Sequence, residues 1–156
     1  MLQEGATPLL ISKNLAELKS NKVSNSNPDK LVLGADSVIS LNDKLINKPK
    51  SRDEALSILK KLNNSKHYLI SSVCISKNGS MIWNHTDSSE LKMKNLTDKE
   101  LSVYLDKIET KILLAYGVYQ IEADGLELFE YVKGDKDSIM GLPIKYIINY
   151  IEQFKK

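Results

Sequence analysis

The chain of 156 residues is long enough for one domain with a hydrophobic core, and its 42% hydrophobic and 27% charged residues exclude a disordered or fibrous protein. A net charge of +2 gives no reason to expect nucleic acid or an anionic membrane as a partner. The lone Cys74 excludes an internal disulfide framework, and no apolar run approaches the roughly 18 residues of a membrane span. Because residues 1–5 also lack a signal-peptide pattern, we expect a cytoplasmic protein with a single domain over residues 1–156.

The first predicted helix begins at Thr7-Pro8, since threonine caps a helix N-terminus and proline fits the first helical position. Its expected buried face carries leucines at helical spacing: Leu9, Leu10, Leu15 and Leu18. A polar loop over residues 24–29 leads to a strand predicted at residues 31–41. That strand contains a lone carboxylate, Asp36, directly after Gly34-Ala35, at a place where open α/β folds bind ligands.

The middle of the chain predicts two helices and a hairpin. Ser51 with Glu54, and Thr97 with Glu100, have the spacing of capping boxes, so each pair predicts a helix start. Between these helices, the β-rich runs at residues 67–76 and 81–93 flank Asn78-Gly79, a strong hairpin signal. Trp83 and His85 on the second arm are interpreted as packing or surface residues. His67 at the start of the first arm is interpreted as a structural residue, and Cys74 as a buried apolar one.

The last part of the chain predicts two more strands, at residues 117–122 and 126–132, and then a helix that opens at Gly141-Leu142-Pro143. The isoleucines of that helix form one stripe: Ile144, Ile147, Ile148 and Ile151. Because helices and strands interleave along the chain, the fold class is α/β, with a mixed twisted sheet and flanking helices.

Short motifs, several of them built on glycine or proline, follow one another along nearly the whole chain: Leu33-Gly34-Ala35-Asp36-Ser37, Lys48-Pro49, Glu54-Ala55, Gly117-Val118-Tyr119-Gln120-Ile121-Glu122, Leu128-Phe129-Glu130, Gly134-Asp135 and Gly141-Leu142-Pro143. In this order they resemble the Maf family of nucleoside triphosphate pyrophosphatases. The resemblance implies the Maf or inosine-triphosphatase-like fold. It also implies that the family's N-terminal strand and helix, with a Ser/Arg phosphate-binding motif, are missing here, so we expect an unpaired strand edge and self-association.

The resemblance implies an enzyme that hydrolyses nucleoside triphosphates, including modified ones, to the monophosphate and pyrophosphate, with a nucleotide as its partner and a homodimer as a compatible assembly. Asp36 is then the general base and a ligand of a divalent cation, Mg²⁺ or Mn²⁺. Lys48, stiffened by Pro49, is a candidate phosphate contact, with a plain surface lysine as an equal alternative. Lys19 is a second phosphate candidate for which the surface reading is favoured.

Two residues bear on the rest of the substrate. Ser37 is a substrate-binding candidate that does not decide base preference. Glu122 matches a family position where glutamate is linked to methylated guanine nucleotides, and its acceptor-only carboxylate suits the N–H edge of guanine. A surface strand glutamate is an equally good interpretation. The alternative to an enzyme is a catalytically impaired nucleotide-binding or interaction protein linked to cell division.

Overall fold

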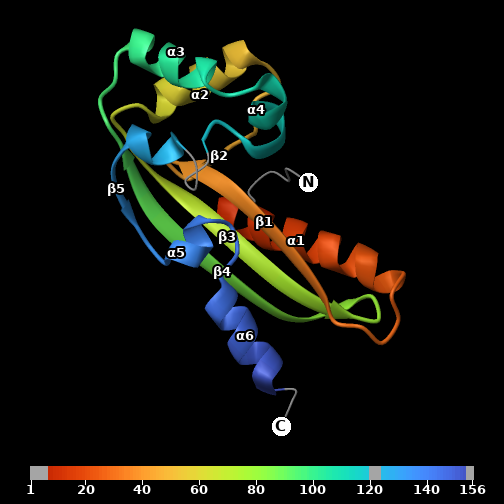
Figure 1. Ribbon diagram of the computed structural model, residues 1–156. Coiled ribbons are helices and arrows are strands. Elements are labelled where there is room, and N and C mark those ends of the chain that lie inside the picture. The colour runs from red at the N-terminus through yellow and green to blue at the C-terminus, as the bar shows by residue number, and fades with distance from the viewer. Residues whose placement is uncertain (1–6, 120–123, 154–156) are drawn as a thin grey trace.

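The computed structural model describes residues 7–119 and 124–153 and shows an antiparallel sheet with helices on both faces and at one end (Figure 1). The sheet has five strands in the order β2-β1-β3-β4-β5, and every strand pair is antiparallel. The strands are β1 (Val32–Leu41), β2 (Lys44–Ile46), β3 (Lys66–Lys77), β4 (Ser80–Met93) and β5 (Phe129–Lys133). The predicted α/β class with flanking helices is confirmed, but the described sheet is antiparallel throughout and not mixed, since hairpins join β1 to β2 and β3 to β4.

The helices lie in three groups around this sheet. The long α1 (Pro8–Asn25) packs on one face, and the short α5 (Lys136–Ile139) and α6 (Ile144–Gln153) lie on the other. The helices α2 (Arg52–Leu62), α3 (Asp98–Asp106) and α4 (Thr110–Tyr116) gather at one end of the sheet. A 3-10 turn, η1 (Asp124–Leu128), precedes β5. In the part of the chain that the structure describes, no helix combines the length and apolarity that a membrane crossing requires.

Helix α1 begins as predicted, with the Thr7 hydroxyl accepting from the Leu10 backbone N–H, but its predicted buried face is wrong. The sheet-facing side carries small residues four apart, whereas three of the four expected leucines are exposed: Leu9, Leu10 and Leu18. The reason is that α1 lies very close to β1 at Gly34. A Cβ added to Gly34 would lie 2.5 Å from the Ala16 carbonyl oxygen. Only small side chains fit such a gap.

The small residues of α1 include serines that bond to serines of β3. The Ser12 and Ser72 hydroxyl oxygens are 2.9 Å apart, and those of Ser20 and Ser76 are 2.7 Å apart. All four side chains are buried, so each hydroxyl needs the partner that it has. The contact between α1 and the sheet is therefore polar as well as close.

The predicted hairpin turn is present, and a second hairpin turn precedes β2. Asn78 and Gly79, both with positive φ, connect β3 to β4 as the sequence predicted. Asn42 and Asp43 have φ values of 52° and 63° and connect β1 to the three-residue β2. Positive φ at both central residues is the type I′ turn that matches strand twist. The turn positions the following loop, which carries Lys48.

The predicted helix starts at Ser51 and Thr97 are confirmed, although only the second forms a complete capping box. The predicted strand at residues 117–122 is wrong over 117–119, because Gly117 ends α4 with a φ of 100° and the chain then runs irregularly. The strand predicted at 126–132 begins only at Phe129, after η1. Helix α4 escaped prediction because its N-cap, Glu109, makes no side-chain capping bond.

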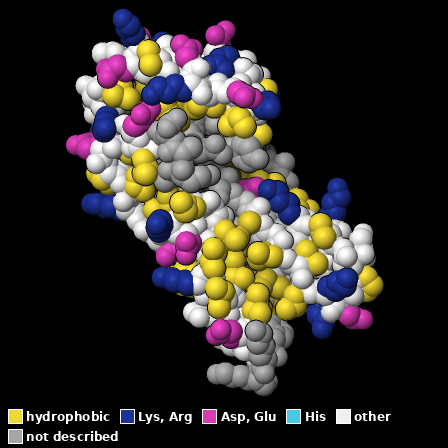
Figure 2. All heavy atoms as spheres, in the orientation of Figure 1, with side chains coloured by type: hydrophobic (Ala, Val, Ile, Leu, Met, Phe, Trp, Pro, Cys, Tyr) yellow, Lys and Arg dark blue, Asp and Glu magenta, His cyan; other side chains and the backbone are white. Residues whose placement is uncertain are grey.

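The expected isoleucine stripe of α6 is only partly buried. Ile147 contacts Val73 and Ile75 of the sheet, but Ile144, Ile148 and Ile151 are exposed. Aromatic rings of β4 and α6 make up the rest of the contact: Trp83 stacks on Tyr150, with ring centroids 4.9 Å apart, and His85 stacks on Tyr146 at 3.8 Å. The packing roles expected for Trp83 and His85 are confirmed. Figure 2 shows the apolar surface that remains around α6.

Candidate active site

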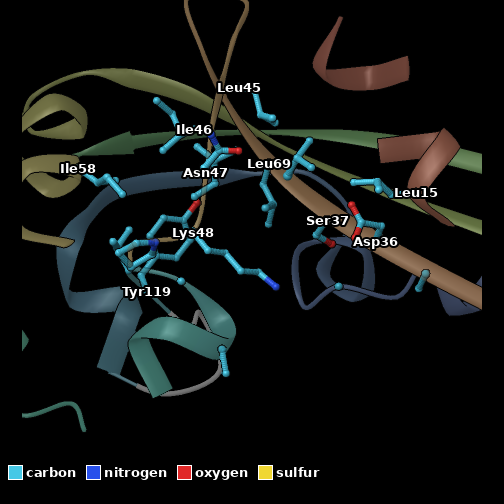
Figure 3. A pocket seen from close by; sticks show the side chains of 18 of the residues that line it. Leu15, Asp36, Ser37, Leu45, Ile46, Asn47, Lys48, Ile58, Leu69 and Tyr119 are labelled. Carbon is cyan, nitrogen blue, oxygen red and sulfur yellow. The ribbon is translucent and has the colours of Figure 1, made fainter. Parts of the chain in front are cut away.

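A cleft of about 700 Å³ lies between the edge of β1 and the helical end of the molecule (Figure 3). One wall is formed by β1, by the underlying part of α1 and by the loop between α5 and α6. The opposite wall is formed by β2, the loop that follows it, α2 and the end of α4. Asp36, Ser37, Lys19 and Lys48 all line this cleft, so the fold brings together the four described site candidates.

The wall formed by β1 is an open strand edge. In the described part of the chain, β2 pairs only with Ile39–Leu41, so the preceding residues of β1 have a partner strand on one side only. Along a strand, the backbone N–H and C=O groups of alternate residues point to the same side. Those of Leu41 point toward β2 at the hairpin, so those of Ala35 and Ser37 point to the same side, where the edge is open. The Lys19 ammonium group, 3.2 Å from the Ala35 carbonyl oxygen, caps part of this edge.

Asp36 is placed between α1 and the cleft by its position on β1. Its Oδ1 lies 2.8 Å from the Lys19 Nζ, and its side chain is only 13% exposed. Its Oδ2 is buried and has no hydrogen-bond partner among the described atoms. A buried carboxylate oxygen without a donor is costly, so this atom is suited to a water molecule, a cation or a substrate hydrogen.

Lys48 comes from the opposite wall. Pro49, which is buried, anchors the loop, and Figure 3 shows the Lys48 side chain extended into the cleft toward the end that holds Asp36 and Ser37. Lys19 and Lys48 therefore bring positive charge to the cleft from two different elements. The Lys19 side chain is 57% exposed, as a surface lysine would be, but its ammonium group also contacts Asp36 in the site. Glu122 lies outside the described residues.

The other half of the cleft is apolar and includes Ile46, Ile58 and Tyr119. Tyr119 donates to or accepts from His67, with the Oη and Nε2 atoms 2.9 Å apart. His67 is fully buried, and this burial lowers its pKa to about 4, so the ring is neutral near pH 7 and packs as expected. Burial also raises the pKa of Tyr119, whose hydroxyl stays protonated. The sequence predicted a packing role for His67, whereas the place of Tyr119 on the cleft wall is evident only from the fold.

Asp36 fits a divalent cation as one ligand of a shared site. The described residues contain no group of three or more His, Cys, Asp or Glu side chains that could hold a metal by themselves. Mg²⁺ is commonly held by one or two carboxylates together with substrate phosphates and water. The unpartnered Oδ2 of Asp36 supplies one such oxygen, and the cleft leaves room for the other ligands.

Comparisons with known proteins show which family the chain resembles over its length. The family model described as Maf-like protein matches residues 2–154. A Pelagibacter ubique protein named nucleoside triphosphate pyrophosphatase is 57% identical over 155 residues, which are 99% of this chain and 80% of that protein. A Ruegeria pomeroyi protein of the same name is 35% identical over 97% of this chain and 76% of its own length. A Rhizobium etli protein named 7-methyl-GTP pyrophosphatase is 33% identical, with 96% and 75% covered.

Proposed function

Because this chain belongs to the Maf-like protein family, we propose that it hydrolyses nucleoside triphosphates to the monophosphate and pyrophosphate. The observation that carries the proposal is the Asp36 carboxylate, which has a buried, unpartnered Oδ2 and lines a cleft that Lys19 and Lys48 also line. A carboxylate held in this way can accept a proton from water, and the two ammonium groups suit the phosphates of the same ligand.

The charges of the cleft fit a triphosphate. A fully ionised nucleoside triphosphate carries about four negative charges, so it needs cations on more than one side. Lys19 and Lys48 come from opposite walls, and Lys19 in addition holds Oδ1 of Asp36, which leaves Oδ2 as the free acceptor. We assign to Asp36 the orientation and deprotonation of the attacking water, and to the two lysines the binding of phosphate oxygens.

A divalent cation such as Mg²⁺ or Mn²⁺, held by Asp36 together with phosphate oxygens, would withdraw charge from the phosphates in this site. Lys19 keeps the Asp36 carboxylate in place through a 2.8 Å contact, and Lys48 reaches the same end of the cleft.

The apolar half of the cleft suits a nucleobase, and we propose a purine such as a modified guanine. The Glu122 carboxylate, as an acceptor-only group, would pair with the guanine N–H edge. The Rhizobium etli relative named 7-methyl-GTP pyrophosphatase supports this choice. Competition between 7-methyl-GTP and unmodified triphosphates in one assay measures the preference directly.

The activity is tested by pyrophosphate release from a panel of triphosphates with Mg²⁺ or Mn²⁺. We expect Asp36→Asn to lower kcat by about 10²- to 10⁴-fold, because the amide cannot take the proton from water. Asp43→Asn, at the exposed tip of the β1–β2 hairpin, is the matched control and retains full activity. Full activity of Asp36→Asn contradicts the base assignment. Saturable nucleotide binding without turnover by the unaltered chain supports the nucleotide-binding alternative.

A further inference from the structure

A chain of hydrogen bonds runs from Ser37 in the cleft into the protein. The Ser37 and Ser71 hydroxyl oxygens are 3.0 Å apart, and the Ser71 hydroxyl lies 2.8 Å from the Ser138 carbonyl oxygen. Ser71 and Ser138 are each 1% exposed, so water does not replace these partners. The relay connects β1, β3 and α5, which meet at this edge of the cleft.

The number of hydrogens fixes the direction of each bond in the relay. A hydroxyl group has one hydrogen to donate, and a carbonyl oxygen has none. Two oxygens 2.8 Å apart need a hydrogen between them, and between Ser71 and the Ser138 carbonyl only Ser71 can supply it. The hydrogen in the contact between Ser37 and Ser71 must then come from Ser37.

The carbonyl at the end of this relay is held firmly. The Ser138 backbone N–H donates to Asp135 Oδ2 at 3.0 Å, and the Ser138 hydroxyl donates to Asp87 Oδ2. Asp87 is held in turn by the His85 ring, with Oδ1 and Nε2 2.8 Å apart. Because the acceptor has these supports, the Ser71 hydroxyl keeps its orientation, and so does the Ser37 hydroxyl.

We propose that Ser71 is a positioning residue that leaves Ser37 Oγ as an acceptor-only group toward the cleft, so that Ser37 binds a hydrogen-bond donor of the nucleoside. This inference rests on the proposed function and deepens it. Ionised phosphate oxygens are acceptors and gain nothing from such a group, whereas a sugar hydroxyl or the exocyclic amino group of guanine does. Phosphates then go to Lys19 and Lys48, and the nucleoside goes to Ser37, next to Asp36 on the same strand.

The test compares KM values for GTP with those for analogues that each lack one donor. The analogues are 2′-deoxy-GTP and 3′-deoxy-GTP for the sugar hydroxyls, and ITP, without the guanine amino group, for the base. We expect the unaltered protein to show a KM about 3- to 10-fold higher for one of them, the size of one hydrogen bond. A sugar penalty identifies the hydroxyl as the donor, and an ITP penalty identifies the base.

The variants separate positioning from general damage. We expect Ser37→Ala and Ser71→Ala each to raise KM for GTP about 3- to 10-fold, so that GTP and the analogue that lacks the donor have similar KM values. The kcat should change by less than about twofold. Ser71→Thr retains the hydroxyl and the penalty. Ser76→Ala is the matched control, because Ser76 is another buried serine of β3, bonded to Ser20 away from the cleft, and its KM values stay unchanged.

Three results overturn the inference: no KM penalty with any analogue, an intact penalty in Ser71→Ala, or the same KM changes in Ser76→Ala. Calorimetric binding of the α,β-methylene forms of GTP and its deoxy analogues separates the two proposals. If the protein releases no pyrophosphate but these probes bind with the expected discrimination, the proposed function fails and the role of Ser71 holds. If turnover is normal and Ser71→Ala discriminates as before, only the role of Ser71 fails.

Discussion

His67 shows how one buried side chain couples the cleft wall to the stability of the fold. It lies behind Tyr119, its Nε2 bonds the Tyr119 hydroxyl, and its Nδ1 is buried without a partner among the described atoms. Burial lowers the pKa of His67 to about 4, from about 6.5 in an unfolded chain. Between these two pH values, His67 is therefore protonated in the unfolded chain and neutral in the folded one.

We predict that the free energy of unfolding decreases as the pH is lowered below about 6.5. Below about pH 4 both states of His67 are protonated, so this residue adds no further decrease. Between pH 7 and pH 5 the contribution of this group is about 2 kcal/mol, measured by urea unfolding at both pH values. His67→Phe should lose most of this pH dependence. His85→Gln, which alters the other described histidine, should retain it. An unchanged slope in His67→Phe contradicts the prediction.

The site residues differ in how far sequence could identify them. Asp36 could be singled out because it follows Gly34-Ala35 in a predicted strand and because ordered motifs surround it. Its contact with Lys19 depends on how α1 crosses the sheet, which no local pattern encodes. The orientation of Ser37 depends on Ser138, a residue 67 positions away from Ser71 in the chain, so only the fold could show it.

At the scale of elements, the helix starts at Thr7, Ser51 and Thr97 were predictable because a side chain caps each of them, whereas α5, capped by Asp135, is only four residues long and was not predicted. Helix α4 has no such cap, and the sequence pattern predicted no element there. The buried face of α1 was not predictable, because leucine spacing indicates where apolar residues recur but not how close the sheet lies. That distance is set by Gly34, on a different element.

We predict that Gly34→Ala destabilises the protein by about 1–3 kcal/mol, since the new Cβ meets backbone of α1 that cannot rotate away. The helix must then shift, and Lys19 moves with it, so nucleotide binding should weaken as well. Urea unfolding and a binding titration measure the two effects. Leu18→Ala, on the exposed side of the same helix, changes stability by less than about 0.5 kcal/mol. A larger loss in Leu18→Ala would contradict the observed helix face.

At the scale of the whole molecule, the open edge of β1 and the apolar surface beside it are the features that favour association. Leu31 and Leu33 are 41% and 43% exposed, and Ile148 of α6 is 48% exposed. Lys19 caps the edge at Ala35, so the uncapped portion lies before that residue. Strand edges that are long, apolar and without charge pair readily with other chains, and a lysine on the edge opposes this.

We therefore predict that the protein self-associates as its concentration rises, and that Leu33→Lys reduces this by placing a charge on the uncapped edge. Light scattering after size exclusion, over a range of concentrations, measures the mass of both forms. Leu126→Lys is the control, since Leu126 is also exposed but lies on η1, away from β1, and its association should match that of the unaltered chain. If the unaltered protein is a monomer at every concentration, the prediction of self-association is wrong. If Leu126→Lys reduces association as much as Leu33→Lys does, the effect is one of net charge and not of the strand edge.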